Sequence, residues 1–290
     1  MSSTLKVDIL VVPGIPAVTA PLPYGLSPVW SPMTATLISG AEDAVLVDAF
    51  MTIAQATELA DWVESFGKNL THIYITHSHG DHFYGLPILL KRFPKARAVA
   101  TAQVVENMKN VVGPNVFGAV WEKMFPGQLE KQQVLTEPLG SSNTILLEGH
   151  VLRAIEVGQS DMNDTTVLHI PDLKLVVAGD VVYNDVHPSL AAVNTKQLQD
   201  AWIASIDKVA ALNPETVIAG HKRIGASDGV DNLAATRDYI RDFSHCMAES
   251  KSPDELYHAM MEKYPHRVNP LVAWRNGLGV FGRGAEILRK

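Results

Sequence analysis

The chain has 290 residues, 47% of them hydrophobic and 19% charged, and 24 Lys and Arg against 31 Asp and Glu give a formal net charge of −7. This length can bury a substantial core, and the composition is that of an ordinary globular protein, which argues against global disorder. The negative charge and the lack of a dense basic run exclude the surface typical of a nucleic-acid binder. We therefore expect no nucleic-acid partner.

The cysteine content and the N-terminus bear on the compartment. Cys246 is the single cysteine, so no disulfide can form within the chain. The N-terminal stretch lacks a basic region and an obvious cleavage site, and no apolar run reaches the roughly 18 residues that span a bilayer. These features predict a cytoplasmic protein without a membrane partner. The oligomeric state stays open, with a homodimer as one alternative.

Strand-like and helical runs alternate along the chain. Strands are predicted at 7–12, 35–38, 44–47, 72–76, 98–101, 144–147, 151–157, 166–170, 175–178 and 216–219. One helix is predicted to begin at Thr52, where Gln55 completes a capping-box pattern. Further helices are predicted at 102–111, 117–125, 197–212, 230–249 and 253–264. The sequence thus predicts one domain over residues 1–250 and a helical C-terminal extension, residues 251–290, packed on it.

The stretch ITHSHGDH, residues 75–82, places three histidines and an aspartate directly after a predicted buried strand. Gly80 allows a tight turn, so His77 and His79 can point to one side while Asp81 and His82 point to the other. Imidazole and carboxylate are common zinc ligands. A surface loop with a capping aspartate is the alternative, but so dense a cluster rarely arises by chance. The stretch therefore predicts two metal half-sites.

The motif at residues 77–82 resembles the H-x-H-x-D-H signature of the metallo-β-lactamase fold. Asp48 in AVLVDA, Asp180 in LVVAGD and His221 in VIAGH are similar to further family positions, and each is expected where a strand gives way to a loop. The resemblance implies class α+β, a four-layer αββα sandwich of two mixed sheets flanked by helices. It also implies that Asp180 bridges two metal ions and that His221 is the last ligand.

One position departs from the family pattern. In VGQSDMNDTT, Gln159 stands where the family usually has a histidine. An amide oxygen is a weaker donor than imidazole, so His77, His79 and Gln159 should hold the first ion less tightly than three histidines would. The alternative is that Gln159 only hydrogen-bonds its own loop. Two zinc ions are expected, with iron or manganese as alternatives.

The metals and the resemblance together predict hydrolysis of a small-molecule substrate. A zinc-bound hydroxide bridging the two ions would attack a carbonyl, while Asp81 orients it and moves a proton to the leaving group. Tyr183 resembles a tyrosine that some lactonases of this fold place over the substrate carbonyl, and His187 is expected to contact the substrate. An apolar entry is expected from the aromatic residues Trp30, Phe83 and Tyr84, together with Tyr24.

Three functions stay open. A lactonase or lactamase that opens a small cyclic ester, amide or carbamate is favoured by Tyr183 and the aromatic entry. A glyoxalase-II-like thioester hydrolase shares the motif and a helical C-terminal part, but no basic cluster for glutathione carboxylates is evident. A non-catalytic metal-binding scaffold is disfavoured, because only Gln159 departs from the expected ligands.

Overall fold

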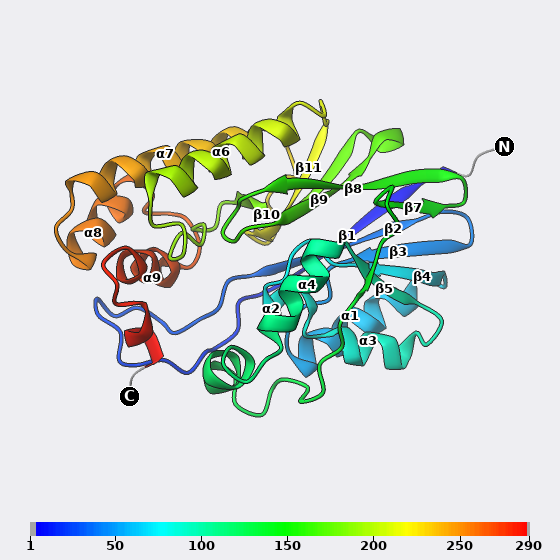
Figure 1. Cartoon of the computed structure of the whole chain (residues 1–290), viewed down its shortest axis with the longest axis horizontal. Helices are drawn as coiled ribbons and strands as arrows, with labels where there is room; N and C mark the ends of the chain where they lie inside the picture. The colour runs from blue at the N-terminus through cyan, green and yellow to red at the C-terminus, as the bar shows by residue number, and fades with distance from the viewer. Residues whose placement is uncertain (1–3, 289–290) are drawn as a thin grey trace.

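The computed structural model describes residues 4–288, which form two β-sheets with helices on both outer faces (Figure 1). The first sheet joins, in this order, β1 (Lys6–Val12), β2 (Met33–Ser39), β3 (Asp43–Val47), β4 (Asn69–Tyr74), β5 (Arg97–Ala100) and β6 (Glu137–Pro138). The second sheet has the order β11 (Thr216–Lys222), β10 (Leu175–Asn184), β9 (Thr165–Ile170), β8 (His150–Gly158) and β7 (Thr144–Leu147).

Both sheets are mixed. In the first, β1 and β2 are antiparallel while β3 and β4 are parallel, and in the second, β8 and β9 are antiparallel while β10 and β11 are parallel. Helices of the first half are α1 (Ile53–Ser65), α2 (Gly80–Phe83), α3 (Leu86–Arg92), α4 (Ala102–Val111) and α5 (Glu122–Met124). Those of the second half are α6 (Lys196–Ala210), α7 (Asp231–Glu249), α8 (Pro253–Lys263) and α9 (Pro270–Val280).

The layers follow from the alternation of side chains along each strand, because successive residues point to opposite faces. In β3, Val47 packs into the core between the sheets, whereas Leu46 packs into the core beneath α1. In β10, Val177 faces the core between the sheets, whereas Val176 packs with Trp202 of α6. The order is therefore helix, sheet, sheet, helix, and the predicted α+β sandwich is confirmed.

Most predicted elements lie within a few residues of the observed ones, and two differ in a way that matters. The helix expected at 117–125 is a π-helical turn, Phe117–Trp121, followed by the short α5. The strand expected to end at Ala178 continues as β10 to Asn184. The predicted capping box at the start of α1 is present, with Thr52 accepting from the backbone N–H of Gln55.

The helices α8 and α9 lie together at one end of the molecule, below the ends of α6 and α7 (Figure 1). Asn276 of α9 anchors this helix to the loop after β10, because its side chain accepts from Leu190 N at 2.7 Å and donates to Pro188 O at 2.8 Å. The division of the chain into a domain and an extension stays a prediction. Within residues 4–288, none of the helices combines the length and the apolar character that crossing a membrane requires.

Candidate metal centre

Two groups of histidine and aspartate side chains converge between the loop after β4 and the strands β10 and β11. The first group is His77, His79, Asp161 and Asp180, and the second is Asp81, His82 and His221. Within each group, the candidate ligand atoms lie within 4.8 Å of one another. Asp180 joins the groups, since its Oδ1 lies 3.2 Å from His82 Nε2 and its Oδ2 lies 3.2 Å from His221 Nε2.

Two glycines, Gly179 and Gly220, allow the backbone to pass close to the candidate ligands. Gly179 adopts φ +49°, and a Cβ there would lie 2.7 Å from Thr76 Oγ1. A Cβ on Gly220 would lie 2.3 Å from Asp180 Oδ1, so only glycine leaves room for that carboxylate beside β11. The pairing of β10 with β11 shifts register around Gly179, which aims Asp180 into the site.

The register shift around Gly179 corrects one expectation from the sequence. Asp180 and His221 were expected where a strand gives way to a loop, but both lie inside their strands, β10 and β11. Gly179 takes a left-handed conformation that absorbs the irregularity, so the strand continues past Asp180.

Three imidazole rings are oriented by hydrogen bonds at Nδ1, the ring nitrogen that faces away from the site. His82 Nδ1 lies 2.8 Å from Asp48 Oδ2, and His77 Nδ1 lies 3.0 Å from Thr76 Oγ1. His221 Nδ1 lies 2.7 Å from the carbonyl oxygen of Pro32. Such outer contacts fix the ring orientation and leave Nε2 to face the site.

Several of the inward-facing atoms have no hydrogen-bond partner among the described residues. They are His77 Nε2, His82 Nε2 and Asp180 Oδ1, all in buried side chains. The last two lie 3.2 Å apart, as an ion pair without the geometry of a hydrogen bond. Leaving a buried polar atom unsatisfied costs about 1–3 kcal/mol, so native structures rarely do so without a reason. A divalent cation accepts these lone pairs, and the mixed nitrogen and oxygen set suits zinc. The residues present therefore fit a metal site.

The electrostatics of the first group also suit a cation. Burial and the neighbouring His82 lower the pKa of His77 to about 3, so this imidazole is neutral and can donate a lone pair. Burial opposes ionisation of Asp180, but His221 and His82 outweigh it and hold the pKa of that carboxyl well below its usual range. Burial would lower the pKa of His79, yet Asp161, 2.8 Å from its Nδ1, raises it to about 9. A metal ion on this pair would replace that proton.

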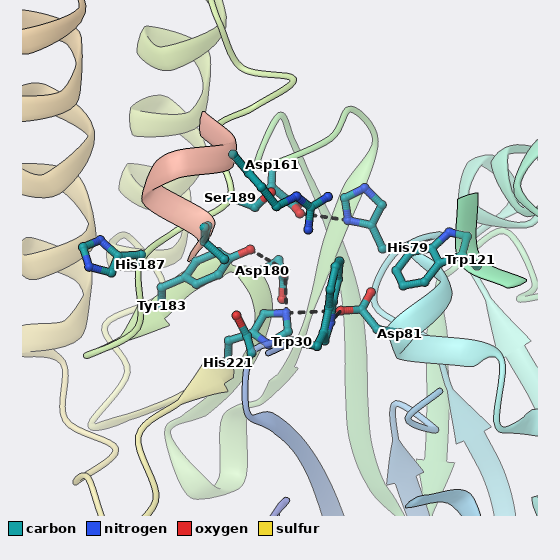
Figure 2. Close-up of a pocket in the computed structure, with 13 residues that line it drawn as sticks. Trp30, His79, Asp81, Trp121, Asp161, Asp180, Tyr183, His187, Ser189 and His221 are labelled. Carbon is teal, nitrogen blue, oxygen red and sulfur yellow. Dashed lines mark hydrogen bonds and ion pairs between the residues drawn. The ribbon is translucent and has the colours of Figure 1, made fainter. Parts of the chain in front are cut away.

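A pocket of about 110 Å³ opens onto the two groups (Figure 2). Its lining comprises Trp30, Ser31, His79, Asp81, Trp121, Asp161, Asp180, Tyr183, His187, Ser189, His221, Val272 and Arg275. The Tyr183 hydroxyl points toward Asp180 and donates to its Oδ2 at 2.5 Å, while Trp30 Nε1 donates to Asp81 Oδ2 at 2.9 Å (Figure 2). Metal-ligand side chains thus form one wall and indole rings form another.

Comparison with known proteins places this site in a family. The sequence model of the Metallo-beta-lactamase superfamily matches residues 29–221, which is more than half of the chain and includes every residue of the two groups. The chain belongs to this superfamily. A metallo-beta-lactamase type 2 from Bacillus sp. (strain 170) is 25% identical over 204 residues, covering 67% of this chain and 68% of that protein.

Two further relatives agree with this assignment. A hydroxyacylglutathione hydrolase from Synechococcus sp. (strain CC9605) is 38% identical over 65 residues, covering 22% of this chain and 24% of that protein. Among solved structures, a metallo-beta-lactamase family protein from Thermus thermophilus superposes with a TM-score of 0.61 at 19% identity, covering 92% of this chain and 93% of that one. The superfamily fold and the clustered ligands support a metal-dependent hydrolase.

Most site residues expected from the sequence lie in the two groups or line the pocket. His77, His79, Asp81, His82, Asp180 and His221 fall in the two groups. Trp30, Tyr183 and His187 line the pocket. Figure 2 shows His187 beyond Tyr183, further from the candidate ligands. The Nδ1 of His187 lies 2.8 Å from the Tyr239 hydroxyl, and burial, with Arg267, lowers its pKa to about 3.

Gln159 is not among the residues that line the pocket. Its amide nitrogen donates to the Ser160 carbonyl at 2.8 Å, as the alternative interpretation of this residue expected. Asp161, two residues later in the same loop, brings a carboxylate to His77 and His79 instead. The signal was present in the sequence, because VGQSDMNDTT offers an acidic side chain two residues after the position that departs from the family pattern.

The expected aromatic entry is only partly correct. Phe83 and Tyr84 are fully buried in the core beside Trp121, and the Tyr84 hydroxyl donates to Val111 O, so neither faces the pocket. Phe83 is the last residue of the short helix α2 and Tyr84 caps it, and both side chains pack into the core rather than toward the ligands. Tyr24 lines a separate pocket near Tyr257.

Several lining residues were not expected from the sequence. Apart from Asp161 these are Ser31, Trp121, Ser189, Val272 and Arg275. They come from separate parts of the chain, and none belongs to a local motif. Only the packing of α9 and of the π-helical turn against the site brings Arg275 and Trp121 to it.

Proposed function

We propose that the protein is a zinc-dependent hydrolase that opens a small cyclic ester, amide or carbamate. The observation that carries the proposal is the shared position of Asp180, within 3.2 Å of two histidines of the second group while it belongs to the first. This arrangement fits two neighbouring metal ions, one held by His77, His79, Asp161 and Asp180 and the other by Asp81, His82, His221 and the same Asp180. Such ions would supply a nucleophile from water at neutral pH and polarise a carbonyl oxygen.

The side chains around the candidate ligands suit the rest of the reaction. Burial, Asp161 and Asp180 raise the pKa of Tyr183 well above its usual value, so its hydroxyl keeps its proton. This proton is donated to Asp180 Oδ2, and the hydroxyl would have to turn from that carboxylate to donate to a substrate oxygen. Trp30 Nε1 donates a hydrogen bond to Oδ2 of Asp81, which leaves Oδ1 of this carboxylate available to pass a proton to the leaving group. Trp30, Trp121 and Val272 provide apolar surface that excludes water from the substrate.

The size of the pocket supports a small substrate. At about 110 Å³, it is of the same order as the roughly 150 Å³ engineered cavity that holds one benzene ring. The pocket could therefore enclose a single ring next to the ligands. A larger molecule would have to extend beyond it.

The test is a panel of lactones, lactams, cyclic carbamates and thioesters, assayed on protein whose zinc content has been measured by elemental mass spectrometry. Hydrolysis of a cyclic substrate should disappear on chelation and return when zinc is added. Asp81→Ala should abolish it, whereas Asp200→Ala, which removes an exposed carboxylate of α6, should not. Zinc-loaded protein that cleaves none of the cyclic substrates would contradict the proposal.

A thioester hydrolase is the second candidate, favoured by the 38% identity with the hydroxyacylglutathione hydrolase over 65 residues. A glutathione thioester carries two carboxylates, but Arg275 is the single Lys or Arg among the lining residues that the structure describes. We therefore rank it second. The thioesters in the panel decide between the two, because faster turnover of a glutathione thioester than of any cyclic substrate would reverse the order.

A further inference from the structure

A second pocket, of about 500 Å³, shares the side chain of Trp30 with the pocket of the metal centre. It lies where residues 13–32, the segment between β1 and β2, meet α8 and the start of α9. Figure 1 shows this blue segment running beside the red helix α9. Small-molecule sites in proteins typically enclose about 300–1,000 Å³. The second pocket is therefore large enough for a ligand of its own.

The lining of the second pocket is aromatic and apolar. Its larger side chains are those of Tyr24, Leu26, Val29, Trp30, Tyr257 and Val268. Among the lining residues that the structure describes, there is no Asp, Glu, Lys, Arg or His. An ion would lose its hydration here without meeting an opposite charge, whereas an apolar ring gains free energy by leaving water. The lining therefore favours an uncharged, largely apolar ligand.

Two tyrosine rings form a fixed flat part of this lining. The rings of Tyr24 and Tyr257 stack with 5.0 Å between their centres and 4° between their planes. The Tyr24 hydroxyl donates to Asp254 of α8, and Trp274 of α9 meets both rings edge-on. Tyr24 nevertheless keeps 46% of its surface exposed. Because these rings are already positioned, an aromatic ligand could pack beside them at a low cost in conformational entropy.

One polar group in the lining has no partner. The Tyr257 side chain is only 6% exposed, yet its hydroxyl forms no hydrogen bond with any of residues 4–288. The Tyr264 hydroxyl, by contrast, donates to Asp242 at 2.7 Å. The Tyr257 hydroxyl is not among the fully enclosed polar atoms, so it reaches open space. Burial raises the pKa of Tyr257, so this hydroxyl keeps its proton and can donate to a ligand.

We propose that the second pocket binds an uncharged two-ring aromatic compound, which lies beside the rings of Tyr24 and Trp30 and accepts a hydrogen bond from Tyr257. A cavity of roughly 150 Å³ holds one benzene ring, so the second pocket has room for two fused rings and the metal pocket does not. The inference does not depend on the proposed function. The ligand would border the metal centre without entering it, because Trp30 Nε1 donates to Asp81.

Two probes with the same ring system test the hydrogen bond. Indole-3-acetamide and 3-methylindole are both uncharged, but only the amide carries a strong acceptor. We expect calorimetry to show that zinc-loaded protein binds both probes. Tyr257→Phe should weaken indole-3-acetamide by about threefold to tenfold and leave 3-methylindole unchanged. Tyr264→Phe, which removes a hydroxyl outside the pocket, should affect neither probe.

A matched pair of valine variants identifies the pocket that the probes occupy. Val29 lines the second pocket and Val272 lines the metal pocket. Val29→Ala removes apolar contacts, so it should weaken both probes by about threefold to tenfold, and Val272→Ala should weaken neither. Failure of both probes to bind would overturn the proposal. Weakening by Val272→Ala in place of Val29→Ala would also overturn it, because the probes would then lie in the metal pocket. An affinity for indole-3-acetamide that survives Tyr257→Phe would refute the hydrogen bond.

Discussion

Asp48 lies directly behind His82, with its Oδ2 2.8 Å from His82 Nδ1, while the Nε2 of the same ring faces Asp180 at 3.2 Å. Asp48 also accepts from the backbone N–H of Thr76 at 3.0 Å, just before the metal motif. One carboxylate therefore fixes both the ring and the loop that carries it. Asp48 adopts φ 63°, a left-handed conformation that asparagine tolerates as well.

We expect Asp48→Asn to weaken metal binding without unfolding the protein. Asparagine preserves the backbone conformation but loses the charge that orients His82, and changes of this kind cost about tenfold to a hundredfold in metal affinity. Competition with a chromophoric chelator measures the change. Asp8→Asn on β1 removes a carboxylate outside the two ligand groups and should have no effect. Unchanged affinity in Asp48→Asn would show that Asp48 only caps the loop.

The loop after β8 offers a pair of variants that identifies the third ligand of the first group. Asp161→Ala should lower the metal content by about one ion per chain, because it removes a carboxylate beside His77 and His79. Gln159→Ala should leave the content unchanged, because Gln159 does not line the pocket and its amide nitrogen is bonded to Ser160 O. Elemental mass spectrometry after zinc reconstitution measures both. The opposite result would restore Gln159 as the ligand expected from the family pattern.

This loop also illustrates how far the sequence could predict the structure. The alternation of apolar residues is a local pattern, so the sequence alone predicts the strands and the main helices. The motif at residues 77–82 is also local, and its spacing alone predicts that its side chains converge. Asp161 and Gln159 are both polar loop residues, and only the path of the loop decides which one faces the ligands. The contributions of Trp121 and Arg275 depend on packing between distant segments, which no local pattern encodes.

Tyr183 should act in the chemical step. Tyr183→Phe removes the hydroxyl that faces Asp180 and that can donate to a substrate oxygen, so kcat should fall by about a hundredfold with little change in KM. Steady-state kinetics on any cyclic substrate found in the panel measure this. Tyr84→Phe is the matched control, because it removes a buried hydroxyl bonded to Val111 O in the core. It should cost about 1 kcal/mol of stability and leave kcat unchanged. Equal kcat values for the two variants would exclude a catalytic role for Tyr183.

His187 should make the protein less stable as the pH falls. It is buried against Tyr239, with Arg267 nearby, and its pKa is lowered to about 3 from an ordinary value of 6.5. Below pH 6.5 the unfolded chain therefore takes up a proton that the folded chain refuses, and the free energy of unfolding falls by up to about 1.4 kcal/mol per pH unit until pH 3. Above pH 6.5 this residue contributes no pH dependence.

His187→Asn removes this titration and keeps a polar group that can reach the Tyr239 hydroxyl. Chemical denaturation of both proteins between pH 7 and pH 4.5, after chelation so that metal release does not contribute, isolates the effect. The variant should be less stable at pH 7, because asparagine fills less space, but its stability should decline less steeply toward low pH. Parallel declines in the two proteins would mean that His187 takes up its proton in the folded state, and that the cavity around it admits a charge.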